Sequence, residues 1–423
     1  MPDASSPIRR DPFADVFRSY EASRARVAGR PDSQARAPGV FAACWRALGC
    51  VPAAQRTVLV TGSKGKGSTA RMVAWNLQRA GHRVGLVVSP EEVCHFDRIR
   101  IDNQPIPAAA FQERLARAMP LLDDELAARA PDRYLSPTGI FLTVALQWFA
   151  DEAVDWVVLE GGRGVQWDEI GQLAARVAVV TSVLDEHVAA LGGTPGNVLR
   201  DKLSIARCAP VTVVDPDVAQ AAADAGLQVP GLRIAAPSPA AAAVAAPAWY
   251  ARLCALAATV VRELGHAPAF QPFSTPSFAW FGLAGTAVLC EPVIHARSID
   301  AGFLRTRLPA GSRVLVGLSD DKDVAGVLDG LRRCGLGEIG AIALTSRADH
   351  VRSGWLQTRA GTVARLGTLD VVEPDLPALR AAVRAFAAGA PALYVVGVQV
   401  FLRCLRQAFS PQLAGPAAVE SAS

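Results

Sequence analysis

The segment that decides the fold reads Thr57-Val58-Leu59-Val60-Thr61-Gly62-Ser63-Lys64-Gly65-Lys66-Gly67-Ser68-Thr69. Its first five residues are β-branched or apolar, which is typical of a buried strand, and the stretch from Ala70 to Ala80 is compatible with a helix. Three glycines, Gly62, Gly65 and Gly67, are in the turn between them. A strand, a glycine-rich turn and a helix in this order predict a loop that binds phosphate.

Each residue type in this turn suits an anionic ligand. Glycines let the backbone turn tightly and aim its N–H groups inward, and the following helix adds its positive N-terminal end. Lys66 would neutralise charge on the β- and γ-phosphates, and the hydroxyl of Ser68 or Thr69 would ligate Mg²⁺. We therefore expect the turn to hold nucleotide through Gly62, Ser63, Lys64, Gly65, Lys66, Gly67, Ser68 and Thr69.

The spacing of this loop, Gly-x-x-Gly-Lys-Gly-Ser, is shorter than the general pattern G-x-x-x-x-G-K-[ST]. The alternative is an ordinary glycine-rich turn that carries two solvated lysines. The strand before the turn and the helix after it favour phosphate binding.

Composition indicates a globular chain without a nucleic-acid partner. With 423 residues the chain is long for a single core, so we expect two domains or three. Hydrophobic residues make up 51% and charged residues 19%, which is enough apolar material for a sizeable core. The net charge is only +4, and no basic block with interleaved aromatics occurs, which argues against nucleic acid as the main partner.

The cysteines indicate a reducing compartment. The eight of them never form a C-x-x-C pair and are spread through apolar runs, so buried free thiols fit better than disulfides or zinc. Neither an N-terminal apolar segment nor an 18-residue apolar span free of charge is present. We expect a cytoplasmic enzyme with no membrane partner.

Strands and helices alternate after a flexible leader, residues 1–44, that carries short helices such as Phe13–Arg26. The alternation predicts a mostly parallel, doubly wound α/β sheet in a domain that covers residues 45–270. Its further strands are expected at Arg83–Val88, Val154–Leu159, Arg176–Val183 and Val211–Val214, and its helices at 107–130, Thr138–Asp151, Thr194–Arg207 and Trp249–Leu264.

A Pro-rich stretch, His266–Pro276, marks the expected boundary to a smaller α/β domain of residues 271–410. A disordered tail, residues 411–423, would follow it. The second domain's strands are expected at Thr286–Cys290, Arg313–Gly317, Ile339–Thr345 and Leu393–Gly397, with helices from Asp300, over 324–333 and over 398–408.

Candidate metal ligands stand where strands end. Glu160 closes one strand and Asp185-Glu186-His187 follows the next, so both would flank the phosphate loop. Mg²⁺ takes hard oxygen ligands with occasional help from histidine. The alternatives are a solvated strand-end carboxylate and a core histidine. The combination with the loop favours a metal.

The order of the motifs resembles the Mur ligase superfamily, and most closely its folylpolyglutamate synthase/dihydrofolate synthase branch. The resemblance covers roughly residues 45 to 405. The motifs are Gly62-Ser63-Lys64-Gly65-Lys66-Gly67-Ser68, Ser89-Pro90 with Phe96-Asp97-Arg98-Ile99-Arg100-Ile101, Glu160-x-Gly-x-Gly, Glu186-His187, Asp201-Lys202 and Asp321-Lys322-Asp323.

The resemblance implies a central domain that carries the P-loop-type sheet, a Rossmann-like C-terminal domain, and ATP-dependent amide formation through an acyl phosphate. ATP, Mg²⁺ and a second cation, divalent or monovalent, would be the cofactors. A small carboxylic acid and an amino acid or other amine would be the substrates. The sequence does not determine the oligomeric state, and we expect a monomer.

The resemblance also implies residue roles. Lys66 would contact the γ-phosphate, and the metals would be held by Ser68, Ser89, Glu160 and His187. Lys202 falls at a lysine that the family carbamylates to hold a second metal; the alternative is a surface Asp-Lys pair. Catalysis would thus rest on Lys66, His187 and Lys202, while His295, Asp321 and Lys322 would help bind nucleotide.

Several motifs depart from the family pattern, mainly in the substrate loops. S-P-H is Ser89-Pro90-Glu91 here, the loop after Glu160 lacks its Thr-Asn end, D-G-A-H-N keeps only its histidine, and P-G-R appears as Thr275-Pro276-Ser277. Two hypotheses remain. One is an active ligase with altered substrates, and the other is an inactive nucleotide-binding or scaffold relative. The intact charged residues favour the ligase.

Overall fold

The computed structural model describes residues 12–236, 247–270, 281–283, 286–346, 351–358 and 363–409. Its contacts divide the chain into two compact units. The first comprises Met1–Lys66, Leu77–Ser89 and Ile99–Arg233, and the second comprises Gly67–Asn76, Pro90–Arg98 and Ile234–Ser423. Thr275-Pro276-Ser277 and the expected tail lie outside the described residues.

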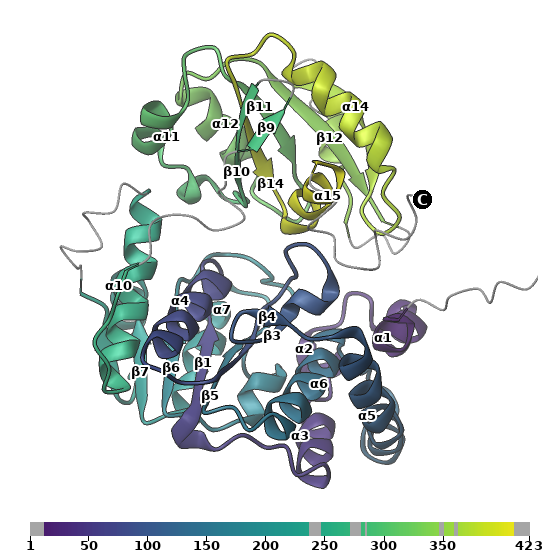
Figure 1. Cartoon of the computed structure of the whole chain (residues 1–423), viewed down its shortest axis with the longest axis vertical. Helices are drawn as coiled ribbons and strands as arrows, with labels where there is room; N and C mark the ends of the chain where they lie inside the picture. Colours follow the sequence, from purple (N-terminus) through teal and green to yellow (C-terminus); the bar gives the residue numbers. More distant parts are fainter. Residues whose placement is uncertain are drawn as a thin grey trace, which may run out of the picture. The chain divides into compact units, whose positions relative to one another are not determined.

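The first unit is built on an eight-stranded sheet with the order β4-β3-β2-β5-β1-β6-β7-β8 (Figure 1). Its strands are β1 Thr57–Thr61, β2 Val84–Val87, β3 Ile99–Ile101, β4 Gln104–Pro105, β5 Trp156–Glu160, β6 Val177–Val180, β7 Val211–Val214 and β8 Leu232–Ile234. From β2 to β7 neighbouring strands are parallel, while β3 and β4 add an antiparallel edge. This confirms the doubly wound, mostly parallel sheet.

The central strands consist almost wholly of buried Val, Leu and Trp, because a parallel sheet is covered on both faces. Helices α3, α5 and α6 pack on one another. The helices of this unit are α1 Ala14–Val27, α2 Asp32–Ala35, α3 Pro38–Ala47, α5 Ala108–Arg129, α6 Pro137–Asp151, α7 Pro195–Leu203 and α8 Pro216–Asp224, and α4 Lys66–Arg79 begins in it.

The leader's expected short helices are present, and they pack into the first unit. Val16 and Val40 are buried, and the Phe13 ring lies 5.3 Å from the ring of Phe111.

The sequence just before helix α6 explains why the helix begins at Pro137. Ser136 caps it by accepting a hydrogen bond from Gly139 N at 3.0 Å, and Pro137 occupies its first turn.

The second unit holds a six-stranded sheet with the order β13-β12-β11-β14-β10-β9, parallel except for β9. Its strands are β9 Phe281–Leu283, β10 Thr286–Glu291, β11 Arg313–Gly317, β12 Ile339–Thr345, β13 Ala364–Asp370 and β14 Ala392–Gly397. Its helices are α10 Ala248–Glu263, α11 Ala301–Arg307, α12 Val324–Arg333, α13 Trp355–Thr358, α14 Leu376–Ala387 and α15 Gln399–Phe409.

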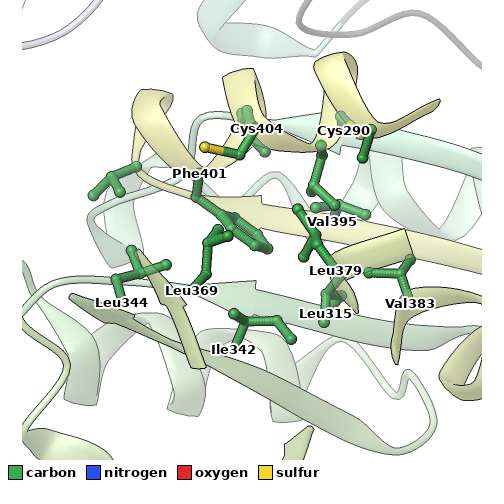
Figure 2. Packing of buried hydrophobic residues seen from close by; sticks show 14 of the residues in the cluster. Cys290, Leu315, Ile342, Leu344, Leu369, Leu379, Val383, Val395, Phe401 and Cys404 are labelled. Atoms are coloured by element: carbon green, nitrogen blue, oxygen red, sulfur yellow. The ribbon is translucent and has the colours of Figure 1, made fainter. Parts of the chain in front are cut away.

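Successive residues of the inner strands alternate between two cores. Val395 belongs to the core under α14 and α15, where Phe401 lies over the sheet (Figure 2), while Tyr394 and Val396 belong to the core under α11 and α12. This period of two is the signature of a sheet covered on both faces. None of the described helices is both long and apolar enough to cross a membrane.

Candidate nucleotide and metal site

Four adjacent strands of the first sheet end beside one another. Ser89 follows β2, Glu160 ends β5, the phosphate loop follows β1, and Asp185-Glu186-His187 follows β6. Because parallel strands place their carboxyl ends at one edge, these segments meet there, as the sequence predicts. Ligands of open α/β sheets bind at this edge.

The phosphate loop is fastened to the end of β6. Ser63 N donates to Ser182 O and Lys64 N to Ser182 Oγ, both at 2.8 Å, and Thr181 Oγ1 donates to Lys64 O at 2.5 Å. A Cβ at Gly62 would lie 2.1 Å from Thr181 Oγ1, and Gly62 has φ +138°. Only glycine fits here. Sequence reasoning missed Thr181 and Ser182, whose only signal is two short hydroxyl side chains at a strand end.

Helix α4 begins at Lys66, four residues earlier than the sequence indicates. Lys66 therefore stands in the first turn, and its Nζ lies 3.4 Å from Ser63 O. Of the two candidate hydroxyls, Thr69 is fully buried and its Oγ1 has no hydrogen-bond partner among the described residues, whereas Ser68 is partly exposed. This difference favours Ser68 as the residue that reaches a bound ion.

Lys202 lies beneath the loop, only 1% exposed. Its Nζ donates to Gly62 O at 3.1 Å and to Arg163 O at 2.9 Å. Burial, reinforced by the charge of Lys66, lowers the pKa of Lys202 to about 8. Asp201 is also buried. These positions exclude the alternative of a surface Asp-Lys pair.

Glu160 is 4% exposed, and its Oε2 accepts a hydrogen bond from Ser89 N at 2.8 Å. His187 adopts φ +56°, a left-handed conformation that few residues other than glycine adopt. Among the described residues, no three His, Cys, Asp or Glu side chains gather as a metal site. The set that the sequence predicts for a cation, Ser68, Ser89, Glu160 and His187, therefore stays a prediction.

In the second unit, His295 caps a short helical turn by accepting a hydrogen bond from Arg297 N at 3.1 Å, and its Nδ1 lies 3.8 Å from Asp323. Lys322 Nζ lies 2.8 Å from Asp321 Oδ2. The contribution of His295, Asp321 and Lys322 to nucleotide binding stays a prediction.

Glu91, which departs from the family's S-P-H, is a buried structural anion. Arg98 Nε donates to Glu91 Oε2 at 2.7 Å, His95 Nδ1 lies 3.3 Å from the same oxygen, and Arg403 donates to Oε1. Burial alone would raise the pKa of Glu91, but the neighbouring Arg98 guanidinium holds this pKa well below its usual range. Glu91 therefore links the segment Pro90–Arg98 to Arg403.

The distribution of lysine singles out the same residues. The chain contains 39 arginines and only four lysines, Lys64, Lys66, Lys202 and Lys322. Three of these four are in the phosphate loop or hydrogen-bonded to it. Lysine and arginine are not interchangeable at sites that require a primary amine, so this concentration of lysine marks the loop as a candidate site.

Comparison with known proteins supports the motif-based resemblance. No family model matches the chain. A dihydrofolate synthase/folylpolyglutamate synthase of Escherichia coli is 32% identical over 178 residues, which is 42% of this chain and 40% of that protein. The chain thus spans less than half the length of the curated relatives it matches.

Solved structures match over nearly the whole length. Mycobacterium tuberculosis folylpolyglutamate synthase complexed with ADP and AMPPCP aligns with a TM-score of 0.72 at 20% identity, covering 95% of this chain and 99% of that one. The fold is that of the folylpolyglutamate synthases. A bifunctional folylpolyglutamate synthase/dihydrofolate synthase with Mn, AMPPNP and L-glutamate bound aligns with a TM-score of 0.68 at 21% identity, covering 88% and 94%. The resemblance expected from the motifs is confirmed.

Proposed function

We propose that the chain is an ATP-dependent carboxylate–amine ligase that forms an amide bond and releases ADP and phosphate. The observation that carries the proposal is the gathering of three of the chain's four lysines on one phosphate loop. The loop's backbone N–H groups and Lys66 would stabilise charge on the transferring γ-phosphoryl group. The substrate carboxylate would accept that group, and the resulting acyl phosphate would be attacked by the amine.

Mg²⁺ would be held by Ser68, Ser89, Glu160 and His187, and when bound it would neutralise phosphate charge. Glu160 is suited to this role because its carboxylate is fixed through Oε2 by Ser89 N. His187 would be held in place by its constrained backbone.

Lys202 would act as a carbamate. Its lowered pKa leaves much of it as the neutral amine at pH 8. The amine nitrogen would attack carbon dioxide, form an N–C bond and lose one proton, which creates a carboxylate for a second cation. One N–H would remain to donate to a carbonyl oxygen of the loop.

The amine we infer first is L-glutamate, because it is bound in a protein of this fold. The acid need not be dihydropteroate, since the loop after Glu160 lacks the family's Thr-Asn end. Seven of the eight free cysteines are buried and Cys94 is partly exposed, which is consistent with a cytoplasmic enzyme.

Phosphate release from Mg-ATP tests the proposal. With dihydropteroate or another folate-like acid and L-glutamate, we expect release that requires both the acid and the amine. Steady ATP hydrolysis that is indifferent to both would contradict a ligase. ATP binding without turnover across a panel of acids and amines would favour the inactive relative.

A further inference from the structure

A second group of charged side chains is buried in the first unit, apart from the nucleotide and metal residues. Asp32 is 1% exposed, Arg36 4%, and both Asp168 and Glu169 are fully buried. Charges withdrawn from water to this extent are costly unless they are paired. The ion-pair partners of these four residues therefore identify the segments that they connect.

Arg36 reaches three acceptors. Its Nη1 donates to Asp168 Oδ2 at 3.0 Å, and its Nη2 donates to Glu169 and to Ser136 Oγ, the latter at 3.4 Å. Asp32 forms a bidentate ion pair with a second arginine. Arg163 Nε donates to Asp32 Oδ2 at 2.8 Å, and Arg163 Nη2 donates to Oδ1. A bidentate pair fixes the orientation of the guanidinium relative to the carboxylate as well as the distance between them.

These contacts tie the region of α2 and α3 to the loop that follows Glu160. Arg163 is in this loop, and its carbonyl accepts the Lys202 ammonium at 2.9 Å. Two later amides, Val165 N and Gln166 N, donate to Asp201 at 2.8 and 3.0 Å. The loop is thus held from α7 on one side and from the leader helices on the other.

We propose that Asp32 and Arg36 are positioning residues, which hold the loop of residues 161–168 so that the Arg163 carbonyl stays at Lys202. Asp32 acts through Arg163, and Arg36 acts through Asp168. The inference deepens the proposed function and rests on it for its kinetic part alone. With this role for Asp32 and Arg36, the leader would contribute to the geometry of the site.

The charges in this group allow a test by a conservative substitution. Three carboxylates, Asp32, Asp168 and Glu169, face two guanidiniums, those of Arg36 and Arg163. Asp32→Asn keeps the shape and leaves two carboxylates for two guanidiniums. It weakens the hydrogen bonds from Arg163 and leaves the contacts of Arg36 with Asp168 and Glu169 in place.

The test compares Asp32→Asn with a matched control, Asp123→Asn. Arg18 pairs with Asp123 at 2.6 Å and so joins the leader helix α1 to α5, but these two side chains are about half exposed. Hydrogen exchange followed by mass spectrometry should show amides of residues 161–168 exchanging about tenfold faster in Asp32→Asn. The control should exchange like the wild type.

Kinetics supply the second readout. Asp32→Asn should lower kcat for acid- and amine-dependent phosphate release by about tenfold, with KM for ATP within about twofold, because only the loop moves. Adding Arg163→Gln should cost nothing further, since Asp32 acts through that side chain.

Unchanged exchange at residues 161–168 in Asp32→Asn, or acceleration spread evenly over the first unit, would overturn the proposal. So would additive losses in the double variant. A wild type without ligase activity would refute the proposed function instead, while the exchange comparison would still decide the role of Asp32.

Discussion

Single residues at the site are explained by what surrounds them. Lys202 combines near-complete burial, two carbonyl acceptors and a lowered pKa, which suits an amine that must lose its proton to react. An arginine could supply the same charge and hydrogen bonds but could not be deprotonated at neutral pH. The scarcity of lysine elsewhere in the chain agrees with this need.

Replacing Lys202 tests that role. Lys202→Ala should lower ligase turnover by about a hundredfold or more, and acetate or formate should restore part of it by replacing the carbamate carboxylate. Lys202→Arg should stay inactive and should not respond to the acids. Exposed Arg200, on the same helix, provides the control, and Arg200→Ala should keep wild-type turnover.

The measurement is phosphate release after circular dichroism has verified that each variant is folded. Wild-type turnover in either Lys202 variant would remove this residue from the mechanism.

Among single residues, those that stand at the ends of strands could be predicted from the sequence. The phosphate loop, Glu160 and Asp185-Glu186-His187 follow strands, and strand ends can be read from the sequence. The fastening residues Thr181 and Ser182 and the positioning pair Asp32 and Arg36 could not be found this way. Their partners lie more than a hundred residues away, and no spacing records such a contact.

Elements were predictable where their pattern is strong. The strands around the phosphate loop and helix α6 consist of apolar runs and match their expected positions closely. Helices α8 and α14 and strand β13 had no prediction. Strand β13 is largely exposed or half-buried along its length, so it lacks the apolar run that marks its buried neighbours.

Close packing of α15 on its sheet gives a prediction for one element. A Cβ at Gly317 in β11 would lie 2.2 Å from Phe401 Cδ1, and Phe401 is fully buried in that core. Gly317→Ala should therefore lower the free energy of unfolding by about 1–3 kcal/mol. Adding Phe401→Leu should recover part of the loss by making room.

Chemical denaturation measures this effect, and Gly367→Ala is its control. Gly367 is in β13 of the same sheet, and a Cβ there would meet no atom within 4 Å. Its free energy of unfolding should change by no more than about 0.5 kcal/mol. Equal losses at Gly317 and Gly367 would contradict the packing argument.

For the whole molecule, two parallel-sheet units follow from alternating strands and helices, and the architecture agrees with the folylpolyglutamate synthases over nearly the full length. The assignment of substrate does not follow in the same way. Fold is set by the buried strands, whereas function is carried by loops and side chains that can differ between proteins of one fold.

We propose above all that the segment from Thr57 to Thr69 builds a nucleotide site. Isothermal titration calorimetry of Mg-AMPPCP into the wild type and into Lys66→Ala tests it most directly. We predict binding by the wild type and an affinity at least about tenfold weaker in Lys66→Ala, because the charge on the phosphates loses its partner. Absence of binding to the folded wild type, or equal affinity in the variant, would contradict the account.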